Sequence, residues 1–286
     1  MRQKNLLEKF QSRTLVIATK HKKEDVIDPI FSLNLGVKCI TLANFDSDIL
    51  GTFTGEIERT QDAFETVRKK CKLAMQLANC DMGIANEGSF GPHPTLGFVN
   101  CDDELLLFLD AKNNLEIWVR EISLQTNFNG KQIKTVSDLE EFANNAKFPS
   151  HALILRAHKD DHKNITKGIT DPNVLVSTFL KLLSEFQSAY VETDMRAMHN
   201  PTRMQVIADG TQKLVKKILS QCPSCNTPGF GITNAIPGLP CEGCGFPTRS
   251  TLFYEYKCDS CAYVENKKFP HGKTKEEQTY CDMCNP

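Results

Sequence analysis

The sequence predicts an α/β protein: a mixed-sheet N-terminal domain, then a helical connector, then a small cysteine-rich C-terminal domain. Three observations carry this prediction. Residues 14–42 read as an apolar strand, an amphipathic helix and a second strand. Two later segments begin with Asp-Pro and Asn-Pro, pairs that favour helix starts. Eight of the twelve cysteines stand in residues 222–284 as four Cys-x-x-Cys pairs.

The length of 286 residues suggests about two domains with a connecting segment. We expect an N-terminal extension at residues 1–12, an α/β domain at 13–170, a helical connector at 171–220 and the cysteine-rich domain at 221–286.

The first elements form a βαβ unit. Residues 14–18 are short, apolar and β-branched, which predicts a buried strand. The helix that follows should end at Gly36, since glycine readily takes the left-handed conformation found after helices. Residues 37–42 then give the second strand, at the spacing of a βαβ unit.

The rest of this domain should contain a long helix and several strands. Apolar residues three or four apart predict a helix at about 61–78, and a strand at 81–85 should end in the Gly- and Pro-rich loop 86–94. An antiparallel meander is expected at about 96–101, 104–110, 115–124 and 151–157. A helix at about 137–146 interrupts it, with Ser137 as its N-cap and Glu140 at N3.

The connector should consist of two helices. Asp171 before Pro172 and Asn200 before Pro201 each place a capping side chain ahead of a proline at the first helical position. Between the two helices, residues 192–203 are crowded with ionisable side chains.

Composition excludes some classes of protein. The net charge of −1 gives no overall attraction to nucleic acid. No apolar run approaches the roughly 20 residues that span a bilayer. The first residues lack the apolar core of a signal peptide, so we expect a cytoplasmic protein with reduced thiols.

Each Cys-x-x-Cys pair can hold one side of a tetrahedral metal ion. Four pairs form two four-thiolate sites with no thiol left over, and we expect two structural Zn²⁺ ions in a double zinc ribbon. Iron and disulfides remain alternatives. The ligands would be Cys222, Cys225, Cys241, Cys244, Cys258, Cys261, Cys281 and Cys284.

The four pairs can combine sequentially, in an interleaved way or in a nested way. We favour sequential pairing, because it closes the shortest first loop. Nested pairing stays open, because residues 241–245 and 256–261 also read as one ribbon.

The charge of the cysteine-rich domain bears on its partners. Residues 221–286 contain six Lys or Arg and seven Asp or Glu, and four thiolates around one dication add further negative charge. Such a surface should repel phosphate backbones, so nucleic acid is an unlikely partner. A structural role, or docking of a protein partner, fits better.

Two features of the N-terminal domain suggest phosphate chemistry. Thr19 and Lys22 stand where the first strand meets its helix, and a helix N-terminus attracts anions. Glu58 and Glu87 are carboxylates placed near expected helix and strand ends, where they could hold Mg²⁺. The alternative interpretation is a solvated basic helix start with exposed glutamates.

These residues resemble those of the house-cleaning NTP pyrophosphatases, in particular the inosine/xanthosine triphosphatases. The resemblance covers roughly residues 13–157 and lies in Ala18-Thr19, in Glu58 ahead of the Ala63/Arg68 helix, and in Asn86-Glu87-Gly88. It implies that Glu58 and Glu87 hold metal or act as base. It also implies that Thr19, Lys22 and Arg68 contact phosphate.

The complete arrangement, with residues 192–203 and the cysteine-rich end, is identified as a member of a bacterial family called domain of unknown function 6671. We expect residues 192–203 to complete a site at the junction of the domain and the helices, where ligands often bind. Asp194 is then a catalytic candidate, and Arg196 and Arg203 are ligand contacts. A salt-bridged linker is the alternative.

The leading hypothesis is a Mg²⁺-dependent enzyme of the NTP pyrophosphohydrolase type, acting on a nucleotide or another phosphorylated small molecule. The rival hypothesis is a non-enzymatic protein whose zinc ribbons dock a protein partner. A nucleic-acid-associated factor is the third.

Overall fold

The computed structural model describes residues 6–43, 45 and 62–286. The chain folds into two compact units, Met1–Val215 and Lys216–Pro286. Over the described residues, no helix is both long enough and apolar enough to cross a bilayer.

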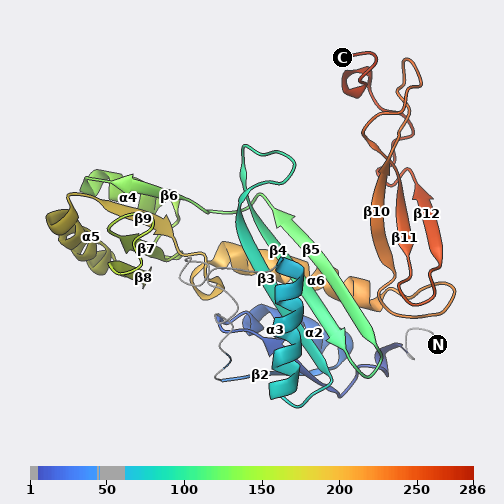
Figure 1. Ribbon diagram of the computed structural model, residues 1–286, viewed down its shortest axis with the longest axis horizontal. Coiled ribbons are helices and arrows are strands. Elements are labelled where there is room, and N and C mark those ends of the chain that lie inside the picture. The colour runs from blue at the N-terminus through green and yellow to red at the C-terminus, as the bar shows by residue number, and fades with distance from the viewer. Residues whose placement is uncertain (1–5, 44, 46–61) are drawn as a thin grey trace. The chain divides into compact units, whose positions relative to one another are not determined.

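A five-stranded mixed sheet forms the centre of the described part of the first unit, in the order β2-β1-β3-β4-β5 (Figure 1). The strands are β1 (Thr14–Ala18), β2 (Lys38–Thr41), β3 (Met82–Pro92), β4 (Asn100–Asp110) and β5 (Leu115–Ser123). β1 runs parallel to β2 and β3, whereas β3, β4 and β5 are antiparallel. The predicted α/β class and the first βαβ unit are therefore confirmed, with α2 (Glu24–Leu35) ending at Gly36 in the left-handed conformation.

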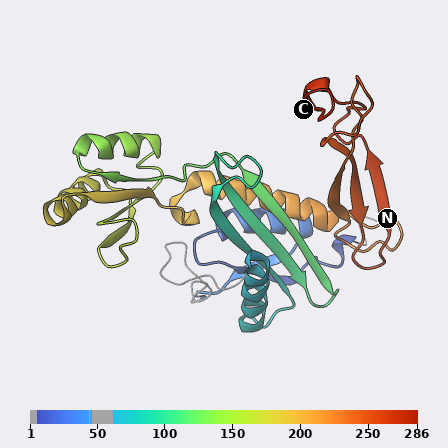
Figure 2. The ribbon, with the colours of Figure 1, turned by 45° about the horizontal axis from the view of Figure 1, so that its top comes forward.

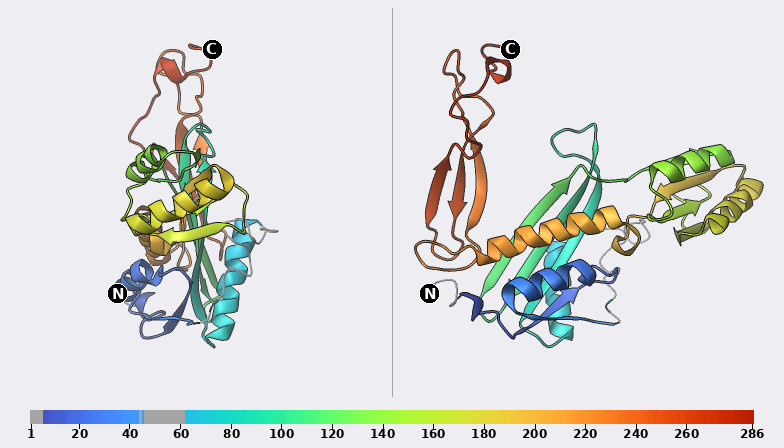
Figure 3. Two further views of the ribbon diagram at one scale, coloured as in Figure 1. Left: turned by 90° about the vertical axis from the view of Figure 1, so that its left-hand side faces the viewer. Right: turned by 180° about the vertical axis from the view of Figure 1, so that it is seen from behind.

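Helices cover both faces of this sheet. α2 lies on one face and α3 (Ala63–Leu77) on the other (Figure 3). On the α3 face, Val67 and Cys71 pack with the apolar residues of β1, β3 and β4. A Cβ atom on Gly83 of β3 would come within 2.7 Å of Met75 Cγ, so glycine is what lets α3 approach the strand this closely.

β3 and β4 are longer than the sequence predicts. The segment 86–94, expected to be a loop, continues β3 as far as Pro92, and 96–110 gives one strand from Asn100 instead of two. The reason is the unbroken pairing of β3 with β4, from Met82 opposite Asp110 to Pro92 opposite Asn100. Figure 2 shows β3, β4 and β5 running side by side. Glu87 therefore lies inside a strand and not at its end.

A second, four-stranded antiparallel sheet occupies residues 130–193 within the first unit. Its order is β6-β9-β7-β8. The elements are β6 (Gly130–Ile133), α4 (Val136–Asn145), β7 (Leu153–Arg156), β8 (Ile165–Ile169), α5 (Pro172–Phe186) and β9 (Ala189–Thr193). Each helix joins two strands that have another strand between them, so the sheet consists of two interlocked split βαβ units. The apolar residues of one face, such as Leu155 and Val191, pack against Phe142 of α4 and Phe179 of α5.

Three local expectations need correction. The strand near 151–157 belongs to this second sheet and not to the meander. The expected two-helix connector contains β9, whose backbone pairs with both β6 and β7. The N-cap of α4 is Thr135, which forms a capping box with Asp138, because this pair offers the same spacing two residues before Ser137 and Glu140.

The last helix of the first unit follows a single 3-10 turn. The turn is η2 (Ala197–His199), and α6 (Pro201–Leu219) begins directly after Asn200. Asn200 accepts a hydrogen bond from the Arg203 backbone N–H at 3.0 Å, as the Asn-Pro signal predicts. The other expected cap, Asp171, accepts from the first turn of α5. In Figure 3, α6 crosses the same side of the five-stranded sheet as α2.

The second unit is built on a small antiparallel sheet in the order β10-β11-β12. Its elements are β10 (Gly231–Pro237), β11 (Thr251–Lys257), β12 (Val264–Lys268) and the 3-10 turn η3 (Gln278–Tyr280). Its apolar cluster is small: Phe230 packs with Tyr256 and Tyr263 around Cys222 and Cys258. A core of this size needs another source of stability.

Candidate functional site

Two groups of four cysteines gather in the second unit. One comprises Cys222, Cys225, Cys258 and Cys261, and the other Cys241, Cys244, Cys281 and Cys284. Within each group, all four sulfurs lie within 4.8 Å of one another. Between the two segments of a group, Sγ–Sγ distances are 3.6 to 3.8 Å for Cys222–Cys261, Cys225–Cys258, Cys241–Cys284 and Cys244–Cys281. Four thiolates at tetrahedral positions around one Zn²⁺ would be about 3.8 Å apart, whereas a disulfide needs about 2.05 Å. The spacing thus fits metal ligation.

All four Cys-x-x-Cys segments adopt the same turn. The carbonyl of the first cysteine accepts the backbone N–H four residues later, at 2.8 to 3.0 Å. In every pair the first cysteine is buried and the second exposed. The N–H of Gly243 points at Cys241 Sγ, 3.4 Å away, as expected for a turn that directs backbone N–H groups at sulfur.

The pairing of the segments is interleaved, which corrects the sequential pairing we favoured and also excludes the nested one. The first segment combines with the third, and the second with the fourth. The cause is the strand topology: β10, β11 and β12 each separate consecutive segments, and antiparallel strands carry the chain to alternate ends of the sheet. Loop-closure entropy grows only slowly with loop length, so strand pairing decides the arrangement.

Where β1 ends, buried polar side chains from both faces of the five-stranded sheet meet. β1 stops at Ala18, and β3 continues past it with Asn86 and Glu87. Lys23, at the start of α2, donates to Asn86 Oδ1 at 2.8 Å. From the other face, Lys70 of α3 pairs with Glu87 and lies 3.4 Å from the carbonyl of Asn86. The carboxyl edge of parallel strands is where open α/β sheets bind ligands.

The charge of Lys23 is strongly affected by this environment. The pKa of its ammonium group is lowered to about 7, mainly by burial and also by the nearby Arg203 and Lys70, against the opposing effect of Glu104 and Glu87. Buried lysines with such a pKa concentrate at functional sites.

A fully buried ion pair lies next to this cluster. Arg203 of α6 donates from Nε to Glu104 Oε1 at 2.7 Å and from Nη1 to the Met195 carbonyl at 2.6 Å. Asn86 donates to the other oxygen of Glu104 at 2.6 Å, which joins the pair to the lysine cluster.

Asp102, two residues before Glu104 on β4, is 1% exposed. Within the part of the chain that the structure describes, its two carboxyl oxygens have no hydrogen-bond partner. Burial and the neighbouring Glu104 carboxylate raise its pKa to about 8, although Arg203 acts in the opposite direction.

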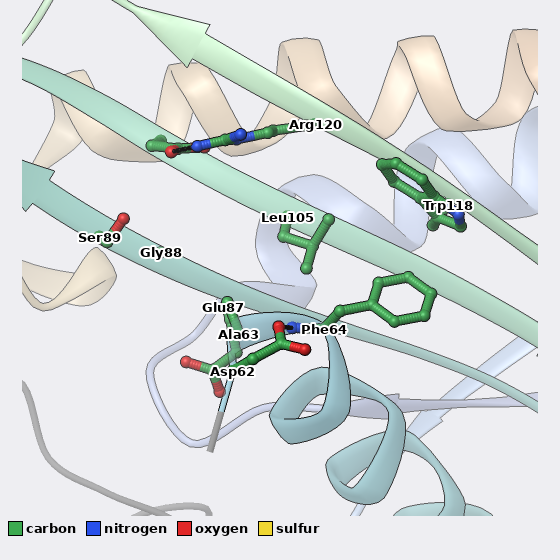
Figure 4. A pocket seen from close by; sticks show the side chains of 10 residues that line it. Asp62, Ala63, Phe64, Glu87, Gly88, Ser89, Leu105, Trp118 and Arg120 are labelled. Atoms are coloured by element: carbon green, nitrogen blue, oxygen red, sulfur yellow. Dashed lines mark hydrogen bonds and ion pairs between the residues drawn. The ribbon is translucent and has the colours of Figure 1, made fainter. Parts of the chain in front are cut away.

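A pocket of about 500 Å³ opens on the α3 face of the sheet (Figure 4). Glu87 reaches it from the buried cluster, and Phe64 and Trp118 form its aromatic end, with ring centroids 5.4 Å apart at 70°. Its lining residues are Asp62, Ala63, Phe64, Glu87, Gly88, Ser89, Asp103, Leu105, Trp118 and Arg120.

The residues that the sequence placed in one cleft differ in their relation to this pocket. Of the predicted site residues, Glu87 lines the pocket described above, and Thr19, Lys22, Arg68, Asp194, Arg196 and Arg203 do not. Glu58 lies outside the described residues. Arg68 binds Glu116 in a bidentate contact and also pairs with Glu65, so carboxylates of the same face already hold its charge.

The remaining predicted contacts lie near the ends of β1 and β9. Thr19 is buried directly after β1 and accepts the His21 N–H at 3.3 Å. Asp194 is buried and holds Arg196 by an ion pair. The pKa of His199 is lowered mainly by burial, and the nearby charges of Arg196 and Lys22 also lower it. Their roles in binding or catalysis stay predictions.

Sequence reasoning missed most of the buried cluster. Lys70 stands in the run Arg68–Lys72, which reads as a solvated helix face. Glu104 carried a readable signal, because strand alternation places it on the same face as Leu106 and Phe108, where a carboxylate requires a partner. Lys23 and Trp118 carried none beyond their residue type.

Comparison with known proteins gives one relationship. No curated protein matches the chain. A family model described as domain of unknown function (DUF6671) matches residues 70–286, a range that includes Lys70, Glu87, Glu104, Arg203 and all four Cys-x-x-Cys segments. Because the match covers most of the chain, this protein belongs to the DUF6671 family.

Proposed function

We propose that the first unit is a Mg²⁺-dependent nucleotide-handling enzyme, of the NTP pyrophosphohydrolase type. One observation supports this above the others. Two buried lysines, Lys23 and Lys70, converge from opposite faces of the sheet on Asn86 and Glu87, beside a pocket that Glu87 lines. Buried cations at the carboxyl edge of parallel strands suit a phosphate group, and a carboxylate next to them suits a metal-bound one.

The pocket residues fit Mg²⁺. This ion prefers one or two carboxylates, with water and phosphate oxygens as the other ligands, and Asp62 and Glu87 both line the pocket. When bound, the ion would supply positive charge to the phosphate oxygens. Lys23 and Lys70 would hold the phosphates, and Glu87 would accept the proton of the attacking water. The water oxygen bonds to phosphorus while the bond to the departing pyrophosphate breaks, which yields a nucleoside monophosphate and pyrophosphate.

The test measures pyrophosphate release from a panel of nucleoside triphosphates with Mg²⁺, using folded, metal-loaded protein. Glu87→Gln should lower kcat by roughly 10²–10⁴-fold, the usual contribution of a general base. Glu116→Gln is the matched control, since Glu116 is a half-exposed carboxylate on the same face that does not line the pocket, and it should turn over normally. Absence of turnover across the whole panel would refute the proposal.

We propose further that the two cysteine groups hold structural Zn²⁺. Four thiolates at tetrahedral spacing are the usual ligands of structural zinc, and the unit has little apolar core without it. Elemental analysis of reduced protein should give two equivalents of zinc. Two equivalents of iron instead would refute the identity of the metal.

Double variants test how the segments pair. Cys222→Ser with Cys258→Ser removes ligands from one group and should leave one equivalent of metal. Cys222→Ser with Cys241→Ser, or with Cys281→Ser, touches both groups and should remove both equivalents. Retention of one equivalent in either of the latter two would contradict the interleaved arrangement.

A second candidate function is docking of a protein partner by the zinc-binding unit. Phe246, Tyr280 and Met283 are 42%, 61% and 64% exposed, and all three stand within two residues of cysteines of the second group. Exposed apolar side chains held by a rigid metal site are typical of interaction surfaces. A partner captured by the full chain should be lost with Tyr280→Ser and Met283→Ser while the zinc content stays at two equivalents.

A further inference from the structure

The pocket on the α3 face has two chemically different ends. Asp62 and Glu87 supply carboxylates at one end, and Glu87 is paired there with Lys70. Phe64 and Trp118 form the other end, and Figure 4 shows their rings next to each other and apart from the two carboxylates. A ligand that fills the pocket must therefore present a charged part and a flat apolar part.

The aromatic end has the geometry of a stacking surface. Phe64 and Trp118 meet edge to face, with centroids 5.4 Å apart, an arrangement that fixes the orientation of both rings. Leu105 of β4 adds an aliphatic side chain to the lining. Trp118 stands on β5, the edge strand of the sheet, and is 43% exposed, which is a large apolar surface to leave accessible.

Further polar groups line the pocket. Asp103 and Arg120 form an ion pair, with Nε 2.7 Å from Oδ1, and Arg120 stands two residues after Trp118 on β5. Ser89, two residues beyond Glu87 on β3, contributes a hydroxyl. These groups offer both donors and acceptors to the edge of a ring. The volume of about 500 Å³ is within the range of pockets that bind small molecules.

From these contacts we infer that the aromatic end of the pocket is a nucleobase subsite. The base stacks on Trp118, its edge faces Arg120 of the Asp103–Arg120 pair, and its sugar directs the phosphates toward Glu87 and Lys70. This inference rests on the proposed function, because the phosphate end is what makes the ligand a nucleotide. It adds that the base, and not the phosphate chain alone, is recognised.

Trp118 is the one tryptophan in the chain, so its fluorescence reports on this subsite directly. Three probes separate the ends of the ligand: inosine or adenosine, which have no phosphate; inorganic triphosphate with Mg²⁺, which has no base; and a nonhydrolysable nucleoside triphosphate. The nucleosides and the nucleotide should change the Trp118 emission in a saturable way. Inorganic triphosphate should not.

Substitutions give the matching affinities by calorimetry. Trp118→Leu should weaken binding of the nonhydrolysable nucleotide between about 5-fold and 150-fold, the usual range for loss of one base–aromatic stack. Binding of inorganic triphosphate should stay unchanged. Phe98→Leu is the control, since Phe98 is an aromatic residue that is 84% exposed and does not line the pocket. Phe64→Leu keeps the fluorophore and provides a second variant if Trp118→Leu fails to fold.

The outcomes separate this inference from the proposed function. Nucleotide binding or turnover that leaves Trp118 emission unchanged, and that Trp118→Leu does not weaken, would overturn the subsite and leave the enzyme proposal standing. Nucleoside binding at Trp118 without any turnover would support the subsite and count against the enzyme. If neither nucleosides nor nucleotides bind, both fail.

Discussion

Replacing Arg203 by methionine should destabilise the first unit severely. The Arg203 and Glu104 side chains are both 0% exposed, and their contact is 2.7 Å. Removing one partner of a buried ion pair leaves the other charge without compensation, which costs about 3–5 kcal/mol. Small domains are stable by about 5–15 kcal/mol, so the loss is a large share of the total.

Urea unfolding followed by Trp118 fluorescence measures this loss. Trp118 is the one tryptophan and lies on β5, next to the strand that carries Glu104, so its signal reports on the first unit. Arg120→Met is the matched control, because Arg120 binds the adjacent Asp103 from a side chain that is 51% exposed. Exposed pairs contribute about 0–1 kcal/mol, so this control should change little.

A double variant shows whether unpaired charge is the cause. Combining Arg203→Met with Glu104→Gln removes both charges and should recover part of the stability that Arg203→Met loses. If Arg203→Met costs no more than Arg120→Met, the pair is not desolvated as described, and the reasoning about the buried cluster fails.

Two further predictions concern the same unit. Asp102→Asn should stabilise it by an amount that grows with pH. The pKa of Asp102 is raised to about 8 in the folded protein, whereas in the unfolded chain this carboxyl group loses its proton near pH 4. Between about pH 4 and 8 the folded wild type therefore binds the extra proton, so its stability falls relative to that of the variant as the pH rises. Unfolding at several pH values checks this, and a difference that shrinks with rising pH would reverse the sign. Gly83→Ala should lower the free energy of unfolding by about 1–3 kcal/mol, because the new Cβ would come within 2.7 Å of Met75 Cγ and 2.9 Å of Cys71 Sγ. An unchanged urea midpoint would show that α3 moves away freely.

The parts of the fold that the sequence predicts correctly are those set by neighbours in the chain. The strand at β1, the helix that ends at Gly36 and the caps at Asp171 and Asn200 all depend on residues a few positions apart. The four Cys-x-x-Cys segments are local in the same sense, so their number predicts two sites.

What the sequence does not show depends on distant partners. Residues 86–92 contain the glycines and proline of a loop, yet pairing with β4 extends them into a strand. The sequence does carry a strand signal for β9, because Ala189, Val191 and Thr193 alternate toward the interior. The helix signals on both sides of this segment led instead to the prediction of a helical connector.

The buried cluster shows the same limit. Lys23 and Asn86 are 63 positions apart, and Glu104 and Arg203 are 99 apart. Apart from Glu104, whose place in an apolar strand indicates burial, each side chain taken alone reads as an exposed polar residue. The folded sheet is what makes them partners, so residue type and spacing point to the lysine-rich loop after β1 but not to the contacts themselves.

The interleaved arrangement decides how the C-terminal unit can be divided. Had each metal been bound by consecutive segments, either half could be excised as a self-sufficient module. Here a cut anywhere between Cys244 and Cys258 splits both ligand sets, so neither fragment retains a complete one. We therefore expect the unit to be gained, lost or transplanted whole, and truncation between Cys244 and Cys258 to abolish both metal sites together.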